Sequence, residues 1–111
     1  MSKIVNSVCK ITEADADTLK QALEMMCKLN NGSLTLIDKN KMMVYCSDLN
    51  ISNRVSIENE QVVVSGESYS IQDAKESIEQ YYEALVTAEE YGGEIEKEEN
   101  GDLVLMLEGE F

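Results

Sequence analysis

The sequence contains no histidine and no proline, and it has few basic residues. Without histidine, the chain cannot form zinc sites built on imidazole, Ser-His catalytic triads or imidazole proton relays. No stretch approaches the roughly 18 consecutive apolar residues of a membrane-spanning helix. The N-terminal segment, residues 1–6, lacks the apolar core of a signal peptide, so we expect a cytoplasmic protein without a membrane partner.

Cysteine is also scarce, with Cys9, Cys27 and Cys46 at wide and irregular spacing. Three cysteines allow one disulfide at most, and no CxxC pair is present to begin a structural zinc site. We therefore expect small buried thiols in a reducing compartment, and neither a metal ion nor a cofactor.

Acidic residues outnumber basic ones by 22 to 9, which gives a net charge of −13. This balance excludes a sequence-neutral nucleic-acid binder, because neutralising phosphates requires an excess of Lys and Arg. It also argues against docking on anionic lipids. The length of 111 residues, with 43% apolar and 28% charged residues, predicts a single globular domain spanning residues 1–111.

Hydrophobic periodicity and turn residues predict an α+β fold, a mainly antiparallel sheet with two helices packed on it. The expected order is β-α-β-β-β-β-α-β-β. The strands are expected at residues 2–11, 33–37, 42–46, 55–57, 61–65, 94–99 and 102–107. The helices are expected from about residue 12 to about 29 and from 70 to 91, with a polar loop over 48–53.

Polar residues and glycines mark the ends of these elements. Thr12 and Ser70 are expected to cap the two helices, because a hydroxyl oxygen there accepts from free backbone N–H groups. Gly92 and Gly93 are expected to end the second helix. The pair Asn100-Gly101 predicts a two-residue hairpin turn.

The acidic excess belongs to one half of the sequence. Residues 1–57 carry 6 acidic and 7 basic side chains, a net charge of +1, whereas residues 58–111 carry 16 acidic side chains against two lysines, a net charge of −14. Helical periodicity places four glutamates in a narrow sector opposite the apolar face of the second helix, and strand alternation places three more on one face of the next strand. These candidate partner-binding residues are Glu76, Glu79, Glu83, Glu90, Glu94, Glu96 and Glu98.

Two interpretations of these glutamates remain open. One is a solvated helix surface and a charged strand that discourages aggregation. The other is a row of carboxylates that imitates a nucleic-acid backbone and occupies the basic groove of a nucleic-acid-binding protein, without contacting nucleic acid directly. No calcium loop, phosphate loop or nucleophile motif is present, so we expect a non-enzymatic binding protein.

The closing segment, residues 103–107, is apolar at every position. Such a strand is either central and covered on both sides or part of a homodimer contact. The alternative function is therefore a housekeeping assembly subunit that acts through this strand or through an open sheet edge.

The C-terminal segment has a tyrosine-bearing helix (Tyr81-Tyr82 to Tyr91), a Gly92-Gly93 break, a Glu-rich strand, an Asn100-Gly101-Asp102 turn and an apolar closing strand. In this order of features it resembles an uncharacterised domain family of cyanobacteria and algal plastids. That resemblance implies a fold and no particular activity. In size, acidity and lack of catalytic motifs, the chain also resembles phage-encoded inhibitors of bacterial defence nucleases, including anti-CRISPR proteins.

Overall fold

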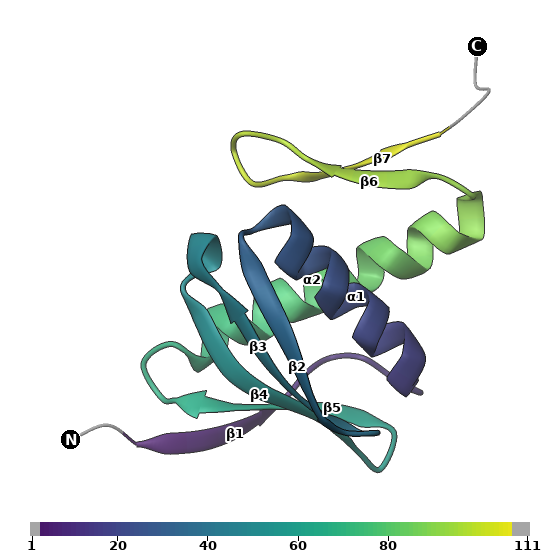
Figure 1. The fold of residues 1–111 in the computed structure, drawn as a ribbon. Coiled ribbons are helices and arrows are strands. Elements are labelled where there is room, and N and C mark those ends of the chain that lie inside the picture. Colours follow the sequence, from purple (N-terminus) through teal and green to yellow (C-terminus); the bar gives the residue numbers. More distant parts are fainter. Residues whose placement is uncertain (1–2, 108–111) are drawn as a thin grey trace.

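A computed structural model describes residues 3–107, and it has the α+β architecture and element order expected from the sequence. Within these residues, two helices and seven strands follow one another (Figure 1). Their bounds are β1 (Ile4–Val8), α1 (Ala16–Leu29), β2 (Gly32–Asp38), β3 (Lys41–Cys46), β4 (Ile51–Glu58), β5 (Gln61–Glu67), α2 (Ile71–Tyr91), β6 (Glu94–Lys97) and β7 (Leu103–Met106), with a short 3₁₀ turn, η1 (Ser47–Leu49), before β4.

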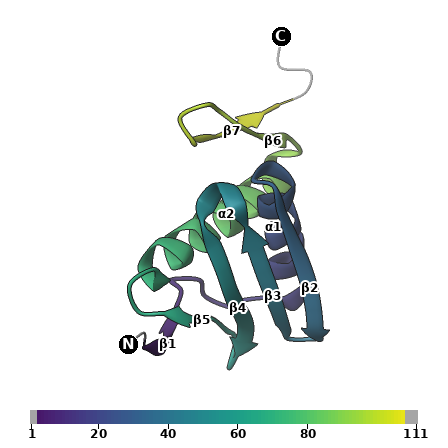
Figure 2. The same ribbon diagram turned by 60° about the vertical axis from the view of Figure 1, so that its left-hand side comes forward.

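Five strands form one antiparallel sheet in the order β1-β5-β4-β3-β2, and β6 and β7 form a separate two-stranded hairpin. Both helices cover the same face of the five-stranded sheet, and no other element of residues 3–107 covers the opposite face (Figure 2). The hairpin lies beyond one end of the sheet, next to the end of α2 (Figure 1). The molecule therefore has a sheet layer, a helix layer and a projecting hairpin.

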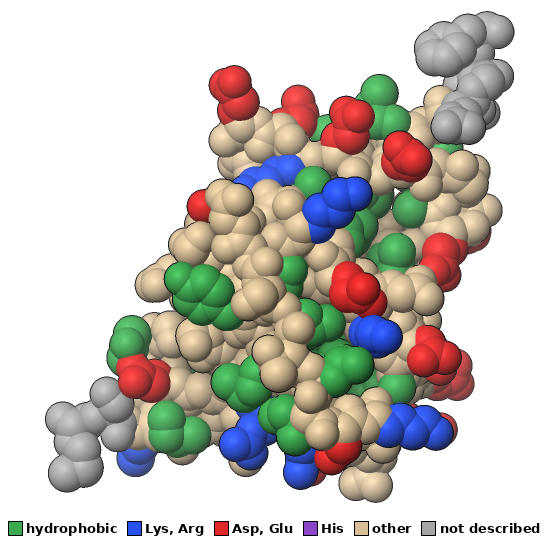
Figure 3. Space-filling model, viewed as in Figure 1, with side chains coloured by type: hydrophobic (Ala, Val, Ile, Leu, Met, Phe, Trp, Pro, Cys, Tyr) green, Lys and Arg blue, Asp and Glu red, His purple; other side chains and the backbone are tan. Residues whose placement is uncertain are grey.

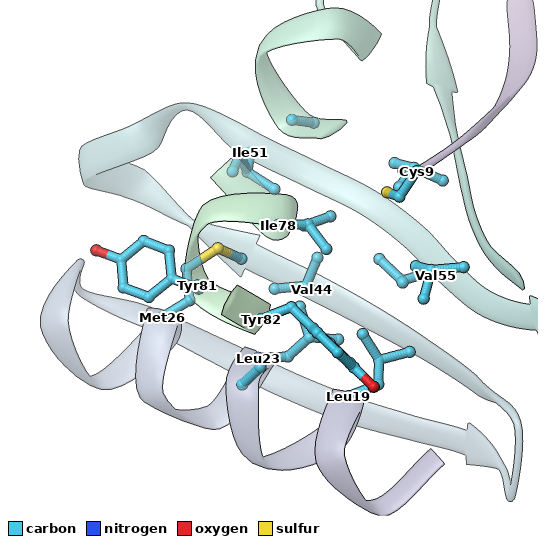
Figure 4. Close-up of a cluster of buried hydrophobic side chains, with 14 of the residues drawn as sticks. Cys9, Leu19, Leu23, Met26, Val44, Ile51, Val55, Ile78, Tyr81 and Tyr82 are labelled. Atoms are coloured by element: carbon cyan, nitrogen blue, oxygen red, sulfur yellow. The ribbon is translucent and has the colours of Figure 1, made fainter. Parts of the chain in front are cut away.

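The core lies between the helices and the covered face of the sheet (Figure 4). From α1, the fully buried Leu19, Leu23 and Met26 follow three- and four-residue steps, which put them on one side of the helix. Val44 and Val55 face them from neighbouring strands, since every second residue of a strand points to the same face.

The first helix begins later than expected, because the predicted cap, Thr12, is not the N-cap residue. Asp15 is the N-cap, and its side chain accepts a 2.9 Å hydrogen bond from the backbone N–H of Thr18. The cause lies at Glu13, whose φ of 52° is left-handed and interrupts any helix starting at Thr12. The first strand is also shorter than expected, and Ser2 lies outside the described residues.

The polar stretch 48–53 is not a loop throughout, because β4 already begins at Ile51. Ile51 is buried, and the side-chain amide of Asn53 is held by a 3.1 Å hydrogen bond to the carbonyl of Ser65 on β5. A buried asparagine with a cross-strand partner is compatible with a central strand, although its propensity favours a loop.

The expected end of α2 is confirmed, whereas its expected start is only partly so. Gly92 has a φ of 74° and its N–H bonds to the carbonyl of Ala88, as a left-handed C-terminal residue does. Ser70 precedes the helix, but its hydroxyl donates to the carbonyl of Glu67 and makes no cap hydrogen bond.

The closing hairpin differs from the prediction in two respects. Its connection spans residues 98–102, so Asn100-Gly101 is not a two-residue turn. Within this connection the N–H of Gly101 bonds to the carbonyl of Glu98, and the N–H of Glu98 bonds to the carbonyl of Asp102. Within the described residues, β7 pairs with β6 alone, so of the two alternatives for this strand the central one, covered on both sides, is wrong, and the homodimer contact stays a prediction.

Candidate acidic surface

The register of the β6–β7 hairpin separates an outward acidic face from an inward face. Glu94 lies opposite Met106 and Glu96 opposite Val104; both glutamates are exposed. Ile95, opposite Leu105, is half-buried because it points toward the helices. The outward face therefore presents two carboxylates beside two apolar side chains.

Lys97 does not neutralise this outward face. It alternates with Glu96 along β6, is half-buried, and its ammonium group donates a hydrogen bond to the side-chain oxygen of Asn30 at the end of α1. Asn30 is fully buried, and its amide donates to the carbonyl of Met26 at 2.7 Å and to the hydroxyl of Tyr81 at 2.8 Å. The one lysine of the hairpin is thus used to attach it to the helices.

Glu98 lies just beyond the end of β6, in the connection between the strands, and is exposed. Its backbone N–H donates to the carbonyl of Asp102 at 2.8 Å. Glu99 and Asp102 are exposed on the same connection. Acidic side chains therefore continue around the tip of the hairpin, and Figure 3 shows them along its upper edge.

The glutamates of α2 differ from one another in what they contact. Glu76, Glu83 and Glu90 are exposed, and Glu76 accepts a 3.0 Å hydrogen bond from Gln72 one turn earlier. Glu79 is only half-exposed, and its carboxylate accepts from the backbone N–H of Lys10, in the segment between β1 and α1. Glu79 is therefore a structural residue as well as a candidate contact residue.

Sequence reasoning could not find this role of Glu79, because its partner lies 69 residues earlier in the chain. Lys10 also lines a surface hollow of about 480 Å³ together with Glu83 and Tyr82. The hydroxyl of Tyr82 accepts a 3.2 Å hydrogen bond from the backbone N–H of Asp15, which fixes the start of α1 against α2. The part of the acidic surface formed by Glu79 and Glu83 thus adjoins the basic residue Lys10.

A second hollow, of about 620 Å³, lies between α1, α2 and β6. Met25, Leu29, Leu85 and Ile95 are among its apolar lining residues, and its charged lining residues are Glu24, Lys28 and Glu94. Glu94 therefore lies where the hairpin's acidic face meets the helix layer.

Residues 3–107 contain neither a metal-binding cluster nor a helix that could span a membrane. No group of three or more His, Cys, Asp or Glu side chains in that range is placed to hold a metal ion. No helix in the same range is long and apolar enough to cross a membrane.

Comparison with known proteins identifies no relative. No family model, no curated protein and no solved structure matches the chain. The likeness to the cyanobacterial and plastid family and the likeness to phage inhibitors therefore rest on the sequence features alone.

Proposed function

We propose that this chain is a non-enzymatic binding protein whose acidic surface docks on a Lys- and Arg-rich, nucleic-acid-binding groove of a partner protein. The observation that carries the proposal is the division of charge within β6. Glu94 and Glu96 are exposed on one side, whereas Lys97 turns inward to Asn30. A lysine on the same face as Glu94 and Glu96 would reduce the repulsion between the two carboxylates and stabilise the hairpin. In this hairpin the lysine instead binds Asn30, so the two carboxylates remain without a cationic neighbour from β6.

The exposed glutamates of α2 extend the surface. From Glu76 to Glu90, the helix rise of 1.5 Å per residue gives a distance of about 21 Å. Glu79 is three residues from Glu76 and four from Glu83, and like charges at these steps cost some tenths of a kcal/mol per pair, a cost that a cationic partner would remove. A row of carboxylates of this length matches the anionic backbone that a basic groove binds. The proposed partner is thus a nucleic-acid-binding protein, such as a defence nuclease.

The experiment compares the wild type with two variants, each of which changes two glutamates to lysine. Glu94→Lys with Glu96→Lys alters the outward face of the hairpin. Glu13→Lys with Glu60→Lys makes the same change in two exposed residues outside the helices and strands. Glu60 is in the β4–β5 turn, away from the hairpin (Figure 1), and Glu13 is in the segment between β1 and α1, where the N–H of the next residue, Ala14, bonds to the carbonyl of Glu60. Each protein is immobilised, exposed to host lysate at low salt and eluted with a salt gradient.

A nucleic-acid-binding protein retained by the wild type and the loop variant, and lost by the hairpin variant, supports the proposal. The purified chain must then displace a fluorescent oligonucleotide from that captured protein, measured by anisotropy. Displacement should weaken with salt, because exposed charges are screened over about 10 Å at 0.1 M. Equal capture by all three proteins, or capture without displacement, would refute it.

A second candidate function, an assembly subunit, is favoured by the open face of the five-stranded sheet. Ile4, Val8, Met43 and Tyr45 lie on that face and are 70%, 46%, 38% and 52% exposed. Analytical ultracentrifugation of the wild type and of Met43→Glu tests it. A salt-resistant dimer that the substitution dissociates would favour assembly through this face, whereas a monomer at all concentrations would argue against it.

A further inference from the structure

Two of the three cysteines meet although they come from different elements. Cys27 is in the last turn of α1 and Cys46 is the last residue of β3, and their sulfur atoms are 3.7 Å apart. The thiol of Cys46 donates toward the sulfur of Cys27, which itself donates toward the carbonyl of Tyr45 at 3.8 Å. Cys9, in the segment after β1, has no part in this pair.

The sheet register leaves room for the sulfur of Cys46. Its partner across the β2–β3 ladder is Gly32, and a Cβ atom at that position would lie 2.7 Å from the Cys46 sulfur. A side chain at residue 32 would overlap the backbone oxygen of Tyr45 as well as this sulfur, so strand β3 or the sulfur would have to move from its present position. The glycine therefore permits the contact between the two thiols.

The two thiols differ in how they can be reached. Cys46 is completely buried, whereas Cys27 is 6% exposed and lines a surface hollow of about 400 Å³. Lys20 and Lys28 line the same hollow, with Glu24 between them on α1. A reagent of small size that enters this hollow would therefore meet Cys27 first, beside two lysines and one glutamate.

The hydrogen bond between the thiols also distinguishes them. Burial raises the pKa of Cys46 to about 12, and its hydrogen bond to Cys27 adds to the rise. Burial raises the pKa of Cys27 as well, but the hydrogen bond received from Cys46 works in the opposite direction. Cys27 is thus the thiol that becomes a thiolate more readily, and the thiolate is the nucleophile in disulfide exchange.

We propose that Cys27 and Cys46 are a modification site, a dithiol pair that a small disulfide such as oxidised glutathione converts into an intramolecular disulfide. The Cys27 thiolate attacks one glutathione sulfur, the glutathione disulfide bond breaks, and one glutathione leaves as its thiolate. The resulting mixed disulfide is attacked by the Cys46 sulfur, which gives up its proton and expels the second glutathione. Two protein thiols are oxidised and one glutathione disulfide is reduced to two glutathione molecules.

The movement this requires is small. The sulfur atoms must approach by about 1.6 Å, from 3.7 Å to the length of a disulfide bond. The bond would tie the end of α1 to β3 beside Asn30, whose carbonyl accepts from the N–H of Asp48. It would therefore reinforce the platform to which Lys97 attaches the hairpin, and it is independent of the proposed function of the acidic surface.

The test is incubation of the folded protein with oxidised glutathione at mildly alkaline pH, followed by intact mass spectrometry and peptide mapping without reduction. The wild type should lose the mass of two hydrogens, with Cys27 and Cys46 in one linked peptide. Cys9→Ala should react in the same way. Cys46→Ala should stop at one glutathionyl group on Cys27, and Cys27→Ala should leave Cys46 unmodified.

Thermal unfolding provides a readout that needs no cysteine variant at positions 27 or 46. Oxidised wild type and oxidised Cys9→Ala should unfold at higher temperature than their reduced forms, and dithiothreitol should reverse the increase. A stable mixed disulfide in the wild type, a link that includes Cys9, or no reaction of the folded protein would each overturn the proposal.

Discussion

The ammonium group of Lys97 and the side-chain oxygen of Asn30 join the projecting hairpin to the end of α1. Asn30 is fully buried and also donates to Met26 and Tyr81, so one side chain links β6, α1 and α2. A buried amide with every partner in place holds a unique arrangement, because any displacement leaves a polar group unpaired. The position of the acidic hairpin therefore depends on a residue outside the acidic surface.

Asn30→Ala should lower the free energy of unfolding by about 2–3 kcal/mol, because it leaves the ammonium of Lys97 and the hydroxyl of Tyr81 without their partner. Tyr81→Phe removes one acceptor and leaves the bond to Met26, so it should cost about 1 kcal/mol. Urea denaturation measures both. A loss below about 0.5 kcal/mol for Asn30→Ala would contradict this account.

Glu79 and Glu83 are one turn apart on α2, so the same substitution at each position gives a matched comparison. Glu79→Ala removes the acceptor for the backbone N–H of Lys10 and should cost about 1 kcal/mol. Glu83→Ala removes an exposed side chain that makes no hydrogen bond to another segment within residues 3–107, so it should change stability by less than about 0.5 kcal/mol. Urea denaturation of both variants checks the difference, and equal losses would remove the structural role of Glu79.

Local patterns predicted the fold class and element order because each helix and strand shows its own periodicity and end signals. The buried stripe Leu19, Leu23 and Met26 needs no distant partner to be recognised. What local patterns missed depends on long-range contacts. The bond from Lys10 to Glu79 and the bond from Lys97 to Asn30 each join residues more than 60 positions apart, and neither leaves a mark on its neighbours in sequence.

The acidic surface also combines features that local patterns could predict with one that depends on a long-range contact. Strand alternation and helix periodicity are local, so they could predict the outward positions of Glu94 and Glu96 and the exposure of Glu83 and Glu90. They could not predict that Lys97 leaves the outward face for a buried partner, because α1 supplies that partner.

Asp15 gives a prediction about pH. Hydrogen bonds from the backbone and side chain of Thr18 lower the pKa of the Asp15 carboxyl below its ordinary value of 3.8. A group whose pKa is lowered by folding stabilises the protein above its unfolded pKa, and this contribution is lost as pH falls through the folded value. Asp15→Asn keeps a capping oxygen but does not titrate. The Tm difference between the two proteins should therefore shrink below pH 3.8, and a constant difference would contradict it.

The contact between Gly66 and the side chain of Asn53 allows a test of packing within the sheet. A Cβ atom at Gly66 would overlap the side-chain nitrogen of Asn53, which donates to the carbonyl of Ser65. Gly66→Ala should therefore displace this buried amide and cost about 1–3 kcal/mol. Asn53→Ala alone should also cost about 1–3 kcal/mol, through the loss of its hydrogen bonds.

The double variant separates steric overlap from a general intolerance of side chains at residue 66. Once Asn53→Ala has removed the overlapping amide, the nearest remaining neighbour of the Gly66→Ala methyl group is the Cδ1 atom of Ile71, at an ordinary contact distance of 3.6 Å. The double variant should therefore lose less free energy of unfolding than the two single variants together, by about 1 kcal/mol or more. Urea denaturation of the wild type, the two single variants and the double variant measures this difference. Strict additivity would show that Gly66 is required for a reason other than the space taken by Asn53.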